Sequence, residues 1–140
     1  MILAYRHQGI VLYGIELQTA LVELACTNAA QNRMTDRIHI VQADIRQLTS
    51  SQVNGPVDLV VCNPPYRRAD SGRINPNSQR AIARHEIQLN LKQLLPSARR
   101  VLRTRGRFAI IYPAERIVDL FHGMRGAGIE PKQMRAIHSR

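Results

Sequence analysis

Short apolar runs alternate along this chain with longer segments that carry helical periodicity. Strands are predicted at Ile10–Ile15, Arg37–Gln42, Val57–Cys62, Phe108–Tyr112 and Met134–His138. Helices are predicted at residues 1–7, Leu17–Asn32, 79–86, about 90–103 and Glu115–Arg125, with turns and polar connectors at 50–56, 67–78 and 104–106. In the helix 17–32, an apolar face is formed by Leu17, Leu21, Leu24 and Ala25. Strands that alternate with helices predict an α/β fold with a parallel sheet.

The strand at 57–62 is the centre of this pattern. Its apolar residues Leu59–Cys62 are consecutive, which predicts a strand buried on both faces of a parallel sheet. The strand stops at Asn63-Pro64-Pro65-Tyr66, where the two prolines favour a stiff, extended loop. In open α/β sheets ligands bind at this carboxyl edge, so the tetrapeptide is the first candidate site.

The length and the composition of the chain are typical of a single globular domain. The 140 residues, 44% of them hydrophobic, predict a single domain over 1–140. No apolar stretch approaches the ~18 residues of a membrane span. Two cysteines, Cys26 and Cys62, lie in apolar surroundings, so we interpret both as reduced core residues of a cytoplasmic protein. The histidines are scattered and predict no metal site.

The charge is strongly basic. Twenty basic residues, only two of them lysine, oppose ten acidic ones and give a net charge of +10. Arginine binds phosphate and stacks on bases, so a polyanionic partner is favoured, although a GC-rich genome would also enrich arginine. A cluster of five follows Tyr66: Arg67, Arg68, Arg73, Arg80 and Arg84. Such a run is often only a solvated face, but beside a candidate base-binding loop it predicts a phosphate contact.

Two carboxylates follow predicted strands. An acidic residue at the position of Glu16 binds ribose hydroxyls in nucleotide-binding folds, about 20 residues after a glycine-rich turn, and that turn would fall before Met1. Glu16 could equally be a solvated strand end. Asp44 could accept a hydrogen bond from a base amine or could cap residues 45–48.

The tetrapeptide has the chemistry to orient an exocyclic amine. The lone pair of such an amine is delocalised into the base, so alkylation requires acceptors that draw its N–H bonds out of the ring plane. The Asn63 side-chain oxygen and the Pro64 carbonyl can supply two acceptors, Pro65 holds them rigid, and Tyr66 can stack on the base, worth roughly 1–3 kcal/mol. The alternative is an ordinary Asn-Pro turn.

Several motifs together resemble a known family. Asn63-Pro64-Pro65-Tyr66 is shared by class I S-adenosylmethionine-dependent N-methyltransferases. The segments 71–76 (SGRINP), 81–86 (AIARHE), 106–113 (GRFAIIYP), Gly14-Ile15-Glu16-Leu17-Gln18 and Gln42-Ala43-Asp44 resemble the bacterial tRNA(Val) adenine-N6 methyltransferases.

This resemblance implies a Rossmann-like methyltransferase sheet with helices on both faces and S-adenosylmethionine as cofactor. Glu16 would bind its ribose, Asp44 its adenine amine, and Asn63 would border the cofactor as well as the target amine. The substrate would be an adenine in the anticodon loop of tRNA, flipped out of its stack. The family also carries an N-terminal strand with a glycine-rich loop and a final strand that this chain lacks. We therefore expect a sheet that is interrupted between the strands 10–15 and 57–62 and again between 107–112 and 133–138, and that is incomplete at both ends.

Two other functions share part of the pattern. Glutamine-N5 methyltransferases of release factors carry the same tetrapeptide, although the basic segment after Tyr66 favours RNA. A non-catalytic RNA-binding remnant would keep the arginines without using the cofactor. The oligomeric state is not indicated by the sequence.

Overall fold

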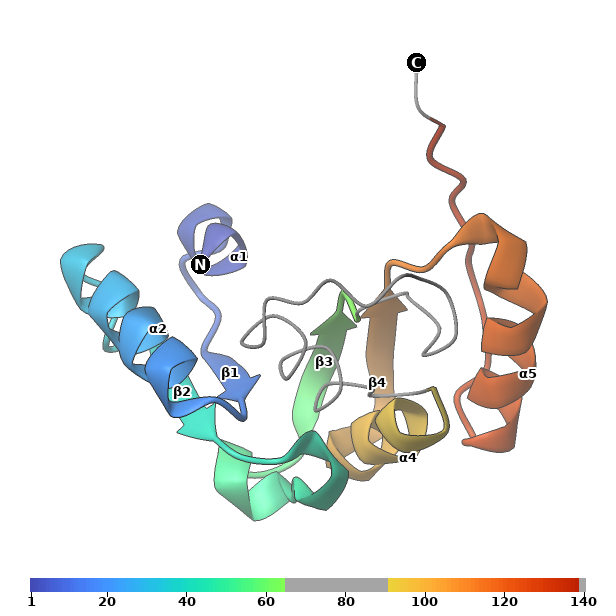
Figure 1. Ribbon diagram of the computed structural model, residues 1–140, viewed down its shortest axis with the longest axis horizontal. Coiled ribbons are helices and arrows are strands. Elements are labelled where there is room, and N and C mark those ends of the chain that lie inside the picture. The colour runs from blue at the N-terminus through green and yellow to red at the C-terminus, as the bar shows by residue number, and fades with distance from the viewer. Residues whose placement is uncertain (65–90, 139–140) are drawn as a thin grey trace, which may run out of the picture. The chain divides into compact units, whose positions relative to one another are not determined.

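The structure, a computed structural model, describes residues 1–64 and 91–138 (Figure 1). The chain divides into two compact units, Met1–Val57 and Asp58–Arg140, and each is described by itself. The predicted segments 67–78 and 79–86 lie outside the described residues. The prediction that residues 1–140 form one domain stays a prediction.

The first unit is a parallel strand pair with its helices. Its elements are α1 (Ile2–Arg6), β1 (Leu12–Glu16), α2 (Thr19–Gln31), β2 (Ile38–Gln42) and the short 3-10 helices η1 (Ile45–Gln47) and η2 (Ser50–Val53). Strands β1 and β2 pair in parallel, with Leu12 opposite Ile38 and Glu16 opposite Gln42. The predicted strands at 10–15 and 37–42 and the helix at 17–32 are confirmed, with ends that shift by one or two residues.

The core of this unit is built from apolar side chains of α1, α2, the two strands and the segment that joins α2 to β2. Its buried members are Ala4, Ala29, Met34 and Ile38, with Leu12 and Ile40 packed against them. Strand β1 approaches its neighbours closely, since a Cβ added at Gly14 would lie 3.0 Å from the Ile40 side chain.

The predicted apolar face of α2 is not buried. Leu17 lies before the helix begins, and Leu21 and Leu24 are 42% and 55% exposed. Cys26 is exposed as well, so its prediction as a core residue is wrong. The helix instead buries Ala29, because the absence of a long side chain lets it lie close to the strands.

The second unit holds the tetrapeptide's strand. Its elements are β3 (Val57–Cys62), α4 (Leu91–Val101), β4 (Leu102–Ile110), η3 (Ala114–Arg116) and α5 (Ile117–Gly126). Strands β3 and β4 form a second two-stranded sheet and run in the same direction (Figure 1). The strand 57–62 and the helix 115–125 are confirmed. The turn predicted at 104–106 lies within β4, although Arg105 has a left-handed φ of 61°.

The core of the second unit lies between α4, α5 and β4. Leu95, Leu120 and Met124 are buried, and Phe108 and Ile110 of β4 pack against them. Strand β3 is less covered than predicted. Leu59 and Val61 are 42% and 54% exposed, so burial on both faces is wrong. In the described part of the chain, β4 is the strand neighbour of β3, and β1 and β2 belong to another sheet.

The α/β class with parallel strand pairs is confirmed, whereas one continuous Rossmann-like sheet is not seen in the described residues. The strands at 12–16 and 57–62 belong to different two-stranded sheets, and the expected interruption and incompleteness of a larger sheet stay predictions. The strand predicted at Met134–His138 is wrong, because residues 131–138 form no strand. Met134 and Ile137 are 64% and 81% exposed, and an apolar pattern cannot form a ladder without a partner strand. None of the described helices combines the length and the apolarity that crossing a bilayer demands.

Candidate functional site

Glu16 is held by the backbone at the carboxyl end of β1. Its Oε1 accepts hydrogen bonds from the backbone N–H groups of Leu17, at 2.8 Å, and Gln18, at 2.9 Å. The turn from β1 into α2 therefore fixes one carboxylate oxygen of the half-buried Glu16 side chain at the strand end. Gln42 braces the same turn from β2, since its Nε2 donates to Thr19 Oγ1 at 2.8 Å.

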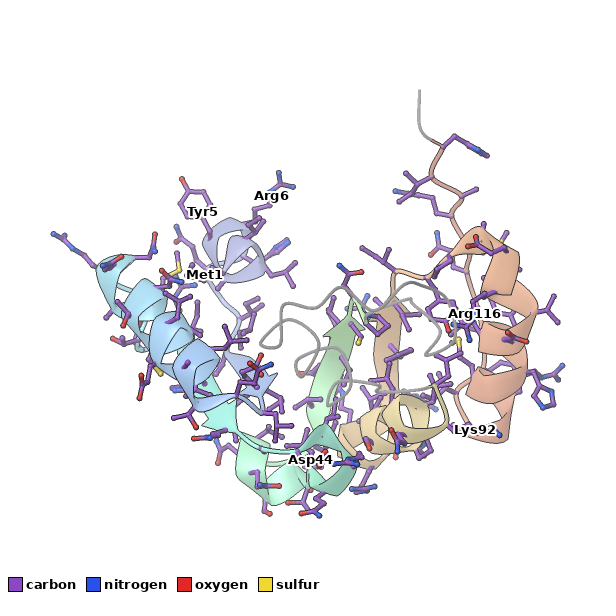
Figure 2. All side chains as sticks on the ribbon, in the orientation of Figure 1. Met1, Tyr5, Arg6, Asp44, Lys92 and Arg116 are labelled. Atoms are coloured by element: carbon purple, nitrogen blue, oxygen red, sulfur yellow. The ribbon has the colours of Figure 1, made fainter. Side chains whose placement is uncertain are left out.

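Asp44 lies beside Glu16 at the same edge of the parallel pair. The Ala43 N–H donates to the Glu16 carbonyl at 3.0 Å, which extends the pairing to the residue before Asp44. From strand spacing and rise, the Cα atoms of Glu16 and Asp44 are about 8 Å apart. Figure 2 labels Asp44 in the segment that follows β2. The unit thus brings together the two carboxylates that the sequence singled out, so a single ligand could contact both.

The Asp44 carboxylate also begins η1. Its Oδ1 accepts from the backbone N–H of Arg46 at 2.9 Å, so the prediction that Asp44 caps the following turn is confirmed. The Arg46 side chain then folds back on the same carboxylate, with Nε 2.9 Å from Oδ1 and 2.8 Å from Oδ2. A second guanidinium nitrogen, Nη2, also contacts Oδ2. The hydrogen bonds from the Arg46 side chain and backbone lower the pKa of Asp44.

We expect this pairing to be visible in the titration of Asp44. Because the pKa is lowered in the fold, the cap and ion pair are complete above the usual carboxyl range and are lost as the pH falls through the lowered value. In Arg46→Ala the Asp44 carboxyl should titrate at higher pH than in the wild type, measured by carbon NMR of the side chain. Identical midpoints in the two proteins would contradict the role assigned to the guanidinium.

In the second unit, Asn63 directly follows β3. The Ile111 N–H donates to the Cys62 carbonyl at 3.1 Å, which fastens the end of β3 to the segment that leaves β4. Of the two tetrapeptide residues that the structure describes, Asn63 is exposed and Pro64 is buried. Cys62 is half-buried rather than a core residue, and burial raises the pKa of its thiol.

The rest of the predicted site lies outside the described residues. This holds for Pro65 and Tyr66 and for the arginines Arg67, Arg68, Arg73, Arg80 and Arg84. Glu16 and Asp44 belong to one unit and Asn63 and Pro64 to the other. Within residues 1–64 and 91–138, His, Cys, Asp and Glu side chains form no group of three that could hold a metal ion.

Sequence reasoning missed Arg46. The available signal was its position two residues after a candidate cap, where a side chain can return to the capping carboxylate. That signal is weak, since it depends on the tight 3-10 turn between the two residues.

Comparisons with known proteins agree on one family. Residues 2–139 match the sequence model of a family described as RMKL-like, methyltransferase domain. A tRNA1(Val) (adenine(37)-N6)-methyltransferase of Porphyromonas gingivalis is 38% identical over 122 residues, which are 86% of this chain and 47% of that protein. A protein of the same name from Shewanella putrefaciens is 32% identical over 117 residues, 83% of this chain and 48% of the relative. The chain spans about half the length of the curated relatives it matches.

Proposed function

Because this chain belongs to the RMKL-like methyltransferase domain family, we propose that it methylates the N6 amine of an adenine in tRNA with S-adenosylmethionine as donor. The observation that carries the proposal is the position of Asn63, an exposed residue directly after a strand whose last carbonyl, that of Cys62, accepts a hydrogen bond from the Ile111 N–H. The names of the relatives support the adenine and the tRNA. The tRNA would be met in the cytoplasm.

The first unit supplies the groups that fit the nucleoside part of the cofactor. Ribose hydroxyls and an adenine amine are hydrogen-bond donors, and carboxylates are acceptors. Glu16 has one oxygen oriented by two backbone amides, and Asp44 stands at the neighbouring strand end. These residues would bind the ribose and the amine, respectively.

The second unit supplies the acceptors for the target amine. The Asn63 side-chain oxygen and the Pro64 carbonyl would each accept one N–H, which localises the nitrogen lone pair. S-adenosylmethionine, when bound, supplies an electrophilic methyl group on a sulfonium sulfur. No strong base is required, because the N6 proton becomes acidic once the nitrogen has been alkylated and can pass to water. Tyr66 would stack on the flipped base, and the five arginines after it would contact phosphates.

A labelled-methyl assay tests the substrate class. The 140-residue chain would be incubated with methyl-labelled cofactor, unmodified tRNA and a release factor. Label on adenine N6 of tRNA is expected. Label in the protein fraction would instead identify a glutamine-N5 methyltransferase. RNA binding that ignores the cofactor, without any transfer, would identify a non-catalytic remnant.

The role of Glu16 is tested by Glu16→Gln. The substitution keeps Oε1 for the Leu17 and Gln18 amides but removes the charge that would face the ribose. Hydrogen bonds to charged groups contribute about 1.5–3 kcal/mol, so we expect S-adenosylmethionine to bind about tenfold more weakly by calorimetry. Glu23→Gln on the exposed side of α2 is the control with the same loss of charge. Equal affinities in the two variants would remove Glu16 from the cofactor site.

A further inference from the structure

Most of the acceptor positions of the Asp44 carboxylate are taken up by a single residue, Arg46. A carboxylate has about four lone-pair positions. Arg46 directs three N–H groups at Asp44: the backbone N–H contacts Oδ1, the single Nε–H is shared between Oδ1 and Oδ2, and Nη2 contacts Oδ2. The pair lies at the surface, with 55% of the Arg46 side chain and 21% of the Asp44 side chain exposed. An incoming donor could therefore reach the carboxylate, but it would meet the guanidinium there.

We propose that Arg46 is a latch on the nucleoside site, a cation that must leave Asp44 before the adenine amine of a nucleoside ligand can bind it. The inference rests on the proposed function, in which Asp44 is the acceptor for that amine. In this proposal, the Arg46 side chain lowers the affinity of the ligand for the site at Asp44. The ligand exchanges one set of hydrogen bonds on the carboxylate for another, so its net binding free energy is reduced by whatever the Arg46 contact contributes.

The structure also predicts whether removal of the Arg46 side chain strengthens or weakens adenosine binding. Arg46 holds Asp44 in two ways, through its backbone N–H and through its side chain. Only the side chain is lost in Arg46→Ala. The backbone N–H still caps η1 and keeps Oδ1 oriented, while Oδ2 becomes available to the ligand. Removal of the guanidinium should therefore strengthen adenosine binding, whereas a residue that merely positions Asp44 would weaken it when removed.

The expected change is small because the ion pair is exposed. Exposed pairs contribute little and are screened by salt, so adenosine should bind Arg46→Ala about two- to fivefold more tightly than the wild type. Because adenosine is uncharged, salt does not directly weaken its own contacts with the protein. Raising the ionic strength should tighten binding to the wild type and leave Arg46→Ala nearly unchanged. At high salt the two proteins should converge.

The experiment is an NMR titration of the 140-residue chain with adenosine and, separately, with inosine, which lacks the amine. Wild type, Arg46→Ala, Asp44→Asn and Arg6→Ala are compared. Arg6→Ala is the matched control, since it removes one exposed arginine charge from α1 in the same unit (Figure 2). Tighter binding of adenosine, but not of inosine, to Arg46→Ala is expected, together with unchanged binding to Arg6→Ala. The Arg46 Nε–H signal of the wild type should also move as adenosine is added.

Each of the other possible results would contradict a specific part of the proposal. If Asp44→Asn weakens adenosine binding but Arg46→Ala binds it equally or more weakly, the latch is wrong and the proposed role of Asp44 stands. If Asp44→Asn leaves the affinity unchanged, Asp44 does not read the amine, and both the latch and that part of the proposed function are wrong. If inosine gains as much as adenosine, Arg46 acts on the nucleoside as a whole, and competition at the amine is refuted.

Discussion

Asn63→Ala should abolish most methyl transfer while leaving the protein able to bind S-adenosylmethionine and tRNA, the two ligands proposed for it. The side-chain oxygen of Asn63 is one of two acceptors proposed for the N6 amine, and alanine offers none. Removing one preorganised hydrogen-bonding group from a reacting centre lowers kcat by about 100- to 1,000-fold, and we expect a loss in that range. The measurement is a single-turnover assay with methyl-labelled cofactor and saturating tRNA.

Measurements of tRNA binding show whether Asn63→Ala loses activity through orientation of the amine or through weaker RNA binding. Phosphate contacts dominate RNA affinity, so tRNA binding to Asn63→Ala should stay within about twofold of the wild type at fixed salt. Asn28→Ala, in α2 of the other unit, is the matched control and should turn over normally. A variant that loses tRNA affinity in proportion to its activity would place Asn63 in RNA binding rather than in orientation of the amine. Unchanged activity would exclude the amine-orienting role.

The parts of the fold that could be predicted are those that local pattern determines. The strand at 57–62 is predicted with its ends because an apolar run meets Asn63 and two prolines, which cannot donate to a strand ladder. The parallel pairing of β1 with β2 follows from the helix that separates them. The cap at Asp44 was predictable for the same reason, since it depends on a residue two positions away.

The incorrect predictions concern tertiary contacts, that is, which segments cover or pair with a given helix or strand. Leu21, Leu24 and Val61 are apolar, and their exposure depends on which segments cover them, which a strand or helix pattern does not contain. Residues 134–138 have a pattern suited to a strand but form none, because a strand also needs an edge to pair with. The pairing of Arg46 with Asp44 depends on a side-chain rotamer and a tight turn, so it becomes evident only in the structure.

Among the substitutions discussed, Leu95→Ala should lower the free energy of unfolding the most. Leu95 is fully buried between α4 and α5, and a Cβ added at Gly123 of α5 would lie 3.0 Å from its side chain, so the helices are in close contact here. Leucine-to-alanine changes at such sites destabilise by about 2–5 kcal/mol, because the cavity does not close fully. Whole domains are stable by only about 5–15 kcal/mol, so the change removes a large part of what holds the unit together.

Urea denaturation followed by circular dichroism measures this loss as a lower midpoint. Val118→Ala is the matched control on α5, because Val118 is 77% exposed and its truncation should change the stability by less than about 0.5 kcal/mol. The same cluster includes Phe108 and Ile110 of β4, and the Ile111 N–H that follows them binds the Cys62 carbonyl just before Asn63. The Leu95 cluster therefore packs against the strand whose following residue is hydrogen-bonded to Cys62, and Leu95→Ala should lose methyl transfer at a lower urea concentration than Val118→Ala. Equal midpoints for the two variants would mean that this cluster does not stabilise the second unit.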